Sequence, residues 1–218
     1  MRIQRRYTNK ARQSSSESQQ RGANAESLVL ESAAHYLRAG RCLLRKRYEP
    51  YKRVGRAGKN GMFKAFPAGS SGPDFELWLS DGRAGMIELK ARNDVRIRLA
   101  DVNPPQASEL DRLTMWGQIA LVLVWLNGEW FLVDWRAWTH EKKRSLNASD
   151  LTLQGASVSA DQHGLPMWLD SLDLAIERGA RYADMLREKQ NIHTQDKKQN
   201  THTNDKKKTK TSRRRTQR

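Results

Sequence analysis

Three side chains near the middle of the chain, Asp74, Glu88 and Lys90, have the types and spacing that divalent-cation chemistry requires. Two neighbouring carboxylates can hold a hard cation such as Mg2+ through oxygen ligands. An ammonium group beside them can orient a water molecule or steady a charged phosphate. The alternative is structural: Asp74 caps a turn, while Glu88 and Lys90 form a solvated ion pair of little energetic weight.

A β-hairpin would bring these three positions together. Strand-like runs at residues 74–79 and 84–91 flank Asp81-Gly82, and Asp-Gly between such runs is a strong hairpin signal. Side chains alternate along a strand, so Glu88 and Lys90 share one face, with Asp74 at the start of the partner strand. The hairpin therefore gathers one aspartate, one glutamate and one lysine into a small patch.

A helix preceding the hairpin supplies a further candidate carboxylate. Apolar residues at helical spacing predict a helix from Arg21-Gly22 to a glycine C-cap at Gly40. Glu26 lies on or beside its apolar face, where an unpaired charge is costly. Glu26 is thus either a margin residue that reaches water or a third carboxylate that points into the cation site.

A second helix follows the hairpin and carries Gln106. Pro104 and Pro105 suit its first turn, and it continues to Gly117. Gln106 in that first turn is expected to point back toward the strand ends, although an ordinary surface glutamine is the alternative.

The remaining apolar runs complete an α/β core. Residues 118–126 are almost uniformly apolar and rich in Val and Ile, which is typical of a central strand covered on both faces. Asn127-Gly128 predicts a tight turn into another strand at 130–135. With a first strand at 41–48, these elements predict one α/β domain over residues 22–140.

A basic segment lies directly before the hairpin. Between Arg38 and Lys64 there are ten basic residues against Glu49 alone, interspersed with glycines and tyrosines. This composition predicts a mobile or projecting element at 49–64 that grips a nucleic-acid backbone, with a solvated loop as the alternative. The expected backbone contacts are Arg53, Arg56, Lys59 and Lys64.

Both ends of the chain are basic and polar. The net charge is +16, and residues 1–13 contribute five basic groups while 189–218 contribute eleven against two acidic ones. We expect a flexible arm at 1–21 and a disordered tail at 189–218, both adding salt-sensitive affinity for polyanions. Residues 141–188 are expected to form loops and a final helix that packs on the core or on a partner subunit.

Composition also indicates the compartment. The longest apolar run is too short to cross a bilayer, and the basic N-terminal segment has no apolar stretch behind it, so neither membrane insertion nor secretion is expected. Cys42 is the single cysteine, expected as a small core residue, and it fits a reducing compartment. The cytoplasm of a bacterium or of a phage-infected cell is the predicted location.

The pattern Pro73-Asp74 followed by Glu88-Leu89-Lys90 resembles the signature of the PD-(D/E)xK nuclease superfamily. The order of the elements over roughly 21–138 resembles the RecU family of Holliday junction resolvases. That resemblance implies a restriction-endonuclease-like core, with a central mixed sheet flanked by helices, and a stalk at 49–64. It also implies a homodimer that cleaves four-way DNA junctions with Mg2+, or Mn2+ as the alternative cation.

The resemblance assigns roles to individual residues. Asp74, Glu88 and Glu26 are the implied metal ligands, Lys90 positions the attacking water, and Gln106 helps to orient the site. The chain departs from the family at Ser70-Ser71-Gly72-Pro73 and at Pro105, where the family has a threonine-rich approach and a histidine. The Gly-Pro-Asp spelling is also similar to VRR-type nuclease modules, which leaves flaps or other branched DNA as alternative substrates. A basic nucleic-acid-binding protein without catalysis is the other alternative.

Overall fold

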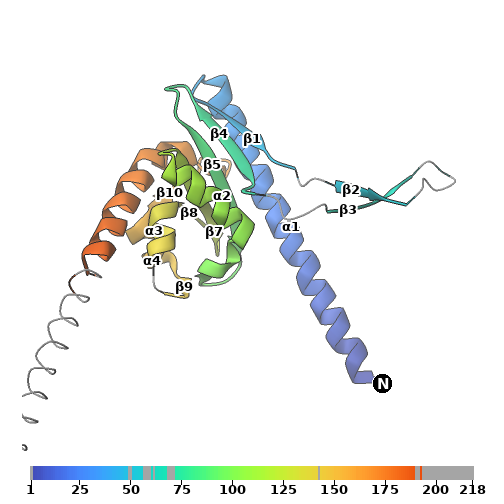
Figure 1. Cartoon of the computed structure of the whole chain (residues 1–218). Helices are drawn as coiled ribbons and strands as arrows, with labels where there is room; N and C mark the ends of the chain where they lie inside the picture. The colour runs from blue at the N-terminus through green and yellow to red at the C-terminus, as the bar shows by residue number, and fades with distance from the viewer. Residues whose placement is uncertain are drawn as a thin grey trace, which may run out of the picture.

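A six-stranded mixed sheet forms the centre of the molecule (Figure 1). The computed structural model describes residues 2–48, 51–55, 60, 62–67, 72–141, 143–189 and 192. The strand order is β1-β4-β5-β7-β8-β10. The strands are β1 (Cys42–Lys46), β4 (Phe75–Leu79), β5 (Ala84–Arg92), β7 (Ile119–Leu126), β8 (Glu129–Asp134) and β10 (Ala156–Val158). Only the β5–β7 pair of this sheet is parallel.

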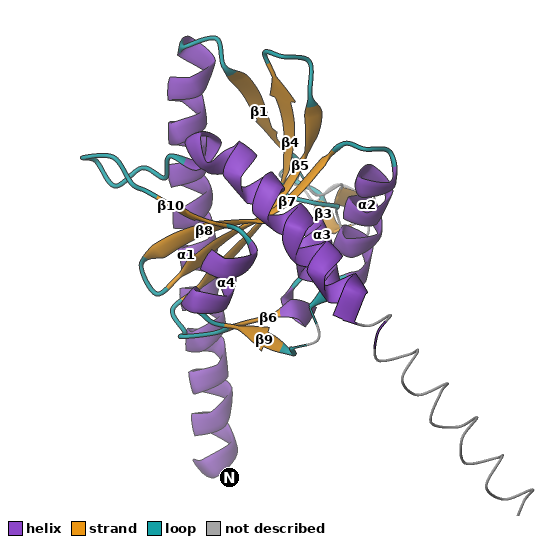
Figure 2. Ribbon diagram, turned by 90° about the vertical axis from the view of Figure 1, so that its left-hand side faces the viewer, coloured by secondary structure: helices purple, strands orange, loops and turns teal. Residues whose placement is uncertain are grey.

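Helices cover both faces of this sheet (Figure 2). One face packs against α1 (Arg2–Arg38) and the first residues of the C-terminal helix (residues 172–189). The other face packs against α2 (Pro104–Met115), α3 (Trp135–His140) and α4 (Ala148–Gln154). Two short 3-10 helices, η1 (Leu99–Asp101) and η2 (Trp168–Ser171), are also present. The predicted α/β class, with a central mixed sheet and flanking helices, is confirmed.

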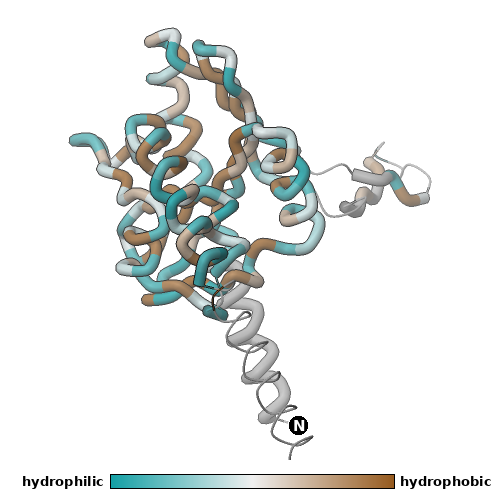
Figure 3. The backbone as a smooth tube through the Cα atoms, turned by 60° about the vertical axis from the view of Figure 1, so that its left-hand side comes forward, coloured by the Kyte–Doolittle hydropathy of each residue, from teal (hydrophilic) through white to brown (hydrophobic). Residues whose placement is uncertain are grey.

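The sheet is the apolar interior of the domain (Figure 3). Seven of the eight residues of β7 are buried, as predicted for a strand covered on both faces. Gly85 allows the parallel neighbour to approach closely, because a Cβ at this position would lie 1.9 Å from the carbonyl oxygen of Ile119. β5, which carries Glu88 and Lys90, is thereby fixed against the most buried strand of the sheet.

The start of α1 differs from the sequence expectation. We predicted a flexible arm at 1–21 and a helix from 21, whereas α1 begins at Arg2. Its buried residues, among them Ala25, Val29 and Ala33, all follow the predicted start. The apolar periodicity therefore marks the part of the helix that packs on the sheet, and the helix itself extends further toward the N-terminus.

The chain after residue 140 contributes more to the domain than predicted. Residues 141–170 were expected to be loop-like, but β10 adds a strand beside β8, and Trp168 of η2 is fully buried. β9 (Ser145–Leu146) pairs with β6 (Ile97–Arg98) in a small separate ribbon. Elements of two or three residues have too few positions to show a periodic pattern, so they could not be predicted from the sequence.

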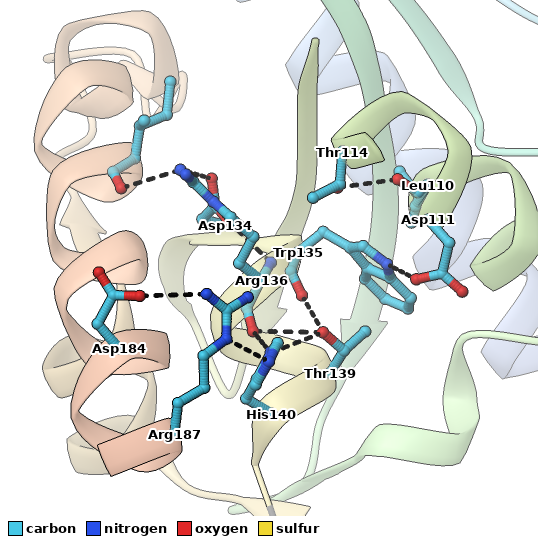
Figure 4. A network of polar contacts seen from close by, with 11 residues as sticks. Leu110, Asp111, Thr114, Asp134, Trp135, Arg136, Thr139, His140, Asp184 and Arg187 are labelled. Carbon is cyan, nitrogen blue, oxygen red and sulfur yellow. Dashed lines mark hydrogen bonds and ion pairs between the residues drawn. The ribbon is translucent and has the colours of Figure 1, made fainter. Parts of the chain in front are cut away.

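The C-terminal helix packs on the core, as one of the two predicted alternatives stated. Leu172 and Ala175 belong to the core on the α1 side of the sheet. Further along, Arg187 donates from Nε to His140 Nε2 of α3 at 3.1 Å (Figure 4). The domain therefore extends past residue 140 to include this helix.

A two-stranded antiparallel ribbon projects from the domain in the view of Figure 1. It consists of β2 (Tyr51–Val54) and β3 (Lys64–Pro67). The predicted projecting element is thus present, with strands that reach to residue 67 rather than 64. The predicted tail at 189–218 lies outside the described residues, except for 189 and 192.

Two further predictions concern the membrane and the cysteine. No helix in the described part of the chain is long and apolar enough to cross a membrane. Cys42 is a free, buried residue of β1, and burial raises the pKa of its thiol to about 11. The cysteine is therefore the small core residue that the sequence predicted.

Candidate active site

The predicted hairpin forms and places Asp74 beside Glu88. β4 and β5 are antiparallel, with Phe75 opposite Ile87, so the next position outward sets Asp74 against Glu88. Asp74 Oδ2 accepts a hydrogen bond from the backbone N–H of Leu89 at 2.8 Å. The carboxyl of Asp74 is therefore held across the strand pair, at the point where β4 begins.

Glu88 is the most unusual acidic group of this site. It is fully buried, at 0% exposure. Oε1 forms an ion pair with Lys90 Nζ, but Oε2 has no hydrogen-bond partner in the described structure. Burial is the main cause that raises the pKa of Glu88 to about 8, and the charge of Asp74 adds to it, while Lys90 opposes the shift. A buried carboxylate oxygen without a partner is rare in folded proteins and is expected at functional sites.

Asp74 is coupled to the same group of charges. Burial raises the pKa of its carboxyl, and the charge of Glu26 raises it further. The hydrogen bond from Leu89, together with the charges of Lys90 and Lys46, acts in the opposite direction. The site therefore holds carboxylates whose charges repel one another, and a bound cation would relieve that repulsion.

Lys90 is held between Glu88 and Gln106. Its Nζ donates to Gln106 Oε1 at 3.4 Å as well as pairing with Glu88. Gln106 is 6% exposed and forms a capping box with Asn103 at the start of α2, with both hydrogen bonds at 3.1 Å. The predicted helix start is confirmed, and Gln106 does face the strand ends. One amide oxygen both closes the helix cap and fixes the amine of Lys90.

Glu26 lies near these groups but is paired with another residue. Its Oε2 forms an ion pair with Lys46 Nζ at the end of β1, and the two side chains are 28% and 30% exposed. Glu26 is therefore a half-buried carboxylate that is paired with Lys46 and lies close enough to Asp74 to raise the pKa of its carboxyl. Lys46 was not among the predicted site residues, although the alternation of β1 places it on the same face as the buried Cys42 and Leu44.

Arg47 is a second residue that sequence reasoning missed. Its backbone N–H donates to the carbonyl of Asp74 at 2.8 Å, and its Nη1 donates to Glu109 Oε1 of α2 at 2.7 Å. Gly72 lies against this pair, because a Cβ there would lie 1.6 Å from Glu109 Oε2. Gly72 thus lets the chain pass the Arg47–Glu109 ion pair on its way into β4. The glycine of the Gly-Pro-Asp sequence therefore has a steric explanation.

The residues fit a hard cation in part. Asp74 and Glu88 offer carboxylate oxygens, and Glu88 Oε2 is a buried acceptor without a donor. Across the described ranges, however, no cluster of three or more His, Cys, Asp or Glu side chains is arranged so that it could hold a metal ion. The ion pair with Lys46 engages the third predicted ligand, Glu26. Asp74 and Glu88 would thus be the ligands present in this arrangement.

The ribbon presents part of the predicted basic surface. Arg53 is exposed, and its guanidinium lies over the Phe63 ring, 4.4 Å from the centroid. Val54 and Met62 are exposed beside them. Of the other predicted contacts, Lys64 has a described backbone in β3 but no described side chain, and Arg56 and Lys59 lie outside the described residues.

Comparisons with known proteins give a distant structural likeness. No protein-family model matches the chain, and no curated protein matches it. Among solved structures, it is similar to Archaeoglobus fulgidus Hjc, a Holliday junction resolvase from an archaeal hyperthermophile, with a TM-score of 0.37 and 16% identity. The match covers 56% of this chain and 88% of that one. A likeness at this level leaves the activity to be argued from the site itself.

Proposed function

We propose that this chain is a divalent-cation-dependent endonuclease that hydrolyses phosphodiester bonds in DNA, with Mg2+ or alternatively Mn2+ as its cation. The observation that carries the proposal is Glu88, a fully buried carboxylate beside Asp74, with one oxygen unpartnered and the other on Lys90. Such an arrangement is costly for a folded chain and is useful where a cation has to be held. A surface hairpin with solvated charges would not bury a glutamate completely.

Each residue has a distinct part in this chemistry. Asp74 and Glu88 would hold the cation, which when bound makes a water nucleophilic near neutral pH and stabilises charge on the phosphate. The Nζ of Lys90, fixed by Gln106 Oε1, can donate a hydrogen bond to the attacking water or to a phosphate oxygen. Gln106 acts through Lys90 and is a positioning residue.

Branched DNA is the proposed substrate, and a four-way junction is the form that suits the chain best. The β2–β3 ribbon projects from the domain and carries exposed Arg53. A projecting basic ribbon can enter the open centre of a junction, whereas plain duplex DNA offers no such space. Arg56, Lys59 and Lys64 are proposed as further backbone contacts, together with the basic tail beyond 189.

The proposal extends to assembly and location. Two symmetric cuts are needed to resolve a four-way junction, so a two-fold homodimer is the expected assembly. The expected place of action is the cytoplasm of a bacterium or of a phage-infected cell, where branched DNA arises during recombination and repair.

Asp74→Asn tests the catalytic assignment. The variant should lose cleavage by at least about 100-fold, the scale of removing one charge-stabilising group at a reaction centre. It should still bind DNA as tightly as the parent or more tightly, because a negative charge near the phosphate is removed. Cleavage of a labelled four-way junction and a binding titration measure both; undiminished cutting by the variant would show that the assigned site is wrong.

A substrate panel tests the specificity. The parent should cut a four-way junction faster than a flap, a nicked duplex or an intact duplex, and only when Mg2+ or Mn2+ is present. Preference for the flap would favour a VRR-type nuclease instead. Binding without cleavage under every cation condition would favour the non-catalytic alternative.

A further inference from the structure

The strand that carries Lys90 leads into a row of three arginines. Side chains alternate along β5, so Arg92, its last residue, lies on the same face as Lys90. Beyond it, Arg96 and Arg98 lie on either side of Ile97, which is fully buried. We call Arg92, Arg96 and Arg98 the arginine track.

Contacts with neighbouring elements hold the track in place. Asp101 of η1 pairs with Arg92 at 3.0 Å and with Arg98 at 3.2 Å, and this carboxylate is only 6% exposed. Arg96 donates from Nε and Nη2 to the Oγ and the carbonyl of Ser145, both at 2.8 Å. Ser145 belongs to β9, which pairs with β6 at the lower edge of the domain in Figure 2. The three guanidinium groups therefore have fixed positions on the body of the domain.

The surroundings of the track leave it positively charged. Residues 92–101 and 143–150 together contain five basic residues against three acidic ones. Asp101 is shared by two arginines, and Asp150 is shared by Arg96 and Lys143. Each of these carboxylates thus leaves one positive charge of its group uncompensated.

A structural role explains Arg92 but not Arg98. A buried carboxylate requires a partner, and Arg92 gives Asp101 a bidentate one, through Nε at 3.2 Å and Nη2 at 3.0 Å. Arg98 adds a second cation to the same carboxylate, although its own side chain is 73% exposed. A guanidinium has five N–H donors, so Arg98 keeps donors for a ligand that approaches from solvent.

We propose that the arginine track binds the phosphate backbone of the DNA strand that enters the candidate active site. The inference rests on the proposed function and names a part of the domain body that holds the substrate. The β2–β3 ribbon follows β1, and β1 and β5 lie on opposite sides of β4 in the sheet. A strand held by the ribbon and by the track would therefore pass the pair of carboxylates at Asp74 and Glu88.

The spacing along β5 suits successive phosphates of one strand. Neighbouring side chains on one face of a β-strand are roughly 6.6 Å apart, and the phosphates of one DNA strand advance about 3.4 Å per nucleotide along the helix axis. Lys90 and Arg92 are thus about two nucleotides apart, and the track would hold phosphates about two to four nucleotides from the bond that is cut. Because the arginines are already fixed, binding costs them little conformational freedom.

The first experiment measures the salt dependence of binding by the full chain to a fluorescent four-way junction, without divalent cation. Arg98→Gln should make the slope of log affinity against log salt shallower by about 0.9, the value for one lost phosphate contact. Arg96→Gln combined with Arg98→Gln should make it shallower by about 1.8. Parent slopes in both variants would overturn the proposal.

Arg181→Gln is the matched control. The side chain of Arg181 is 77% exposed and pairs with one carboxylate, that of Glu177, so it resembles Arg98 in exposure and in its partner. Its loss removes the same charge from the C-terminal helix and should leave the slope unchanged. An equal effect in Arg181→Gln and Arg98→Gln would mean that the overall positive charge, and not the track, accounts for binding.

The second experiment locates the contact on the DNA. Junctions are made in which a methylphosphonate replaces one phosphate at a time and so removes a single negative charge. At the phosphates that the track contacts, this replacement should weaken binding by the parent about threefold and binding by Arg98→Gln less than about 1.5-fold. These positions should lie about two to four nucleotides from the bond that is cut when Mg2+ is added. If no position distinguishes Arg98→Gln from the parent, the track does not contact the backbone.

The two proposals can fail separately, because the binding measurements involve no cleavage. A chain that binds the junction through the track and cuts no DNA with any divalent cation would support the track and contradict the nuclease. A chain that cuts DNA and keeps the parent slope after the loss of Arg96 and Arg98 would keep the nuclease and lose the track.

Discussion

Two buried carboxylates in this sheet, those of Asp134 and Glu88, differ in how completely they are hydrogen-bonded. Asp134, at the end of β8, is 5% exposed and is surrounded by donors: Oδ1 accepts from the backbone N and the Nε of Arg136, both at 2.8 Å, and Oδ2 accepts from its Nη2 at 2.9 Å (Figure 4). Glu88, at 0% exposure, has an oxygen without a hydrogen-bond partner in the described structure and shares its surroundings with another carboxylate.

The contrast separates a charge that the fold compensates, Asp134, from Glu88, which we propose as a metal ligand. Asp134 caps α3, and its bidentate contact with Arg136 satisfies both oxygens, so its burial is compensated inside the fold. The burial of Glu88 is compensated only in part by Lys90. An incompletely paired charge lowers the stability of the fold unless a ligand pairs with it, and that is the physical mark of a binding site.

Removal of the structural charge should have the largest effect on stability. Asp134→Ala leaves Arg136 without its partner and uncaps α3, so the free energy of unfolding should fall by about 3 kcal/mol. Urea denaturation measures the change. Glu177→Ala, which breaks the exposed i,i+4 ion pair with Arg181, is the control and should show no measurable change. A small loss for Asp134→Ala would remove the distinction between the two carboxylates.

Removal of the Glu88 carboxylate should stabilise the protein, and the effect should depend on pH. Below pH 4.5 the carboxyl of Glu88 is protonated in both the folded and the unfolded chain. Between pH 4.5 and about 8 the folded protein holds a proton that the unfolded chain has released, because the pKa of Glu88 is raised, so stability falls as the pH rises through this range.

Glu88→Gln removes that loss while keeping the shape of the protonated side chain. Without divalent cation, its free energy of unfolding should exceed that of the parent by about 2 kcal/mol at pH 9 and match it at pH 5. Thermal and urea melts at the two pH values measure the difference, and junction cleavage should be lost at both. Destabilisation at pH 9 would mean that Glu88 is well compensated, as Asp134 is.

Gln106 allows a positioning role in the proposed site to be distinguished from a helix-capping role. Gln106→Ala removes one of the two contacts that hold the amine of Lys90, so the cleavage rate should fall about tenfold, within the range for residues that orient a site. Asn147→Ala is a matched control, because Asn147 and Asp150 form a similar capping box at the start of α4. That control should lower stability by about 1 kcal/mol and leave cleavage unchanged. Equal cleavage losses in both variants would indicate a general folding defect.

Arg53 is expected to give the smallest effect. Arg53→Ala removes one exposed cation of the ribbon, so the slope of log affinity against log salt should become shallower by about 0.9 for junction DNA. Arg181→Ala, an exposed cation on the C-terminal helix, should leave the slope unchanged. Fluorescence anisotropy over a salt series measures both slopes; identical slopes for the parent and Arg53→Ala would place the DNA elsewhere.

Local signals in the sequence were sufficient for the hairpin and for α2. Asp81-Gly82 fixed the turn, and the alternation of β5 placed Glu88 and Lys90 on one face. Pro104 and Pro105 marked the start of α2 and hence the inward position of Gln106. Each of these features is decided within a few residues, so a single sequence is enough to predict them.

The ion-pair partners of charged side chains could not be predicted from local sequence patterns. The pairing of Glu26 with Lys46 joins α1 to β1, and that of Arg47 with Glu109 joins β1 to α2. Such contacts depend on how helices sit against the sheet, which local patterns do not specify. Two elements were missed because they show no apolar pattern. The N-terminal part of α1 carries no apolar stripe, and β10, with three residues, is too short to show an alternation.

The hydrogen bond from the Arg47 N–H to the Asp74 carbonyl joins the end of β1 to the start of β4. Arg47 follows the last residue of β1, on the path that leads to β2, and the same bond anchors the residue that opens β4. Under the proposed function, DNA held by the ribbon would therefore be linked to the backbone of Asp74 through this one hydrogen bond.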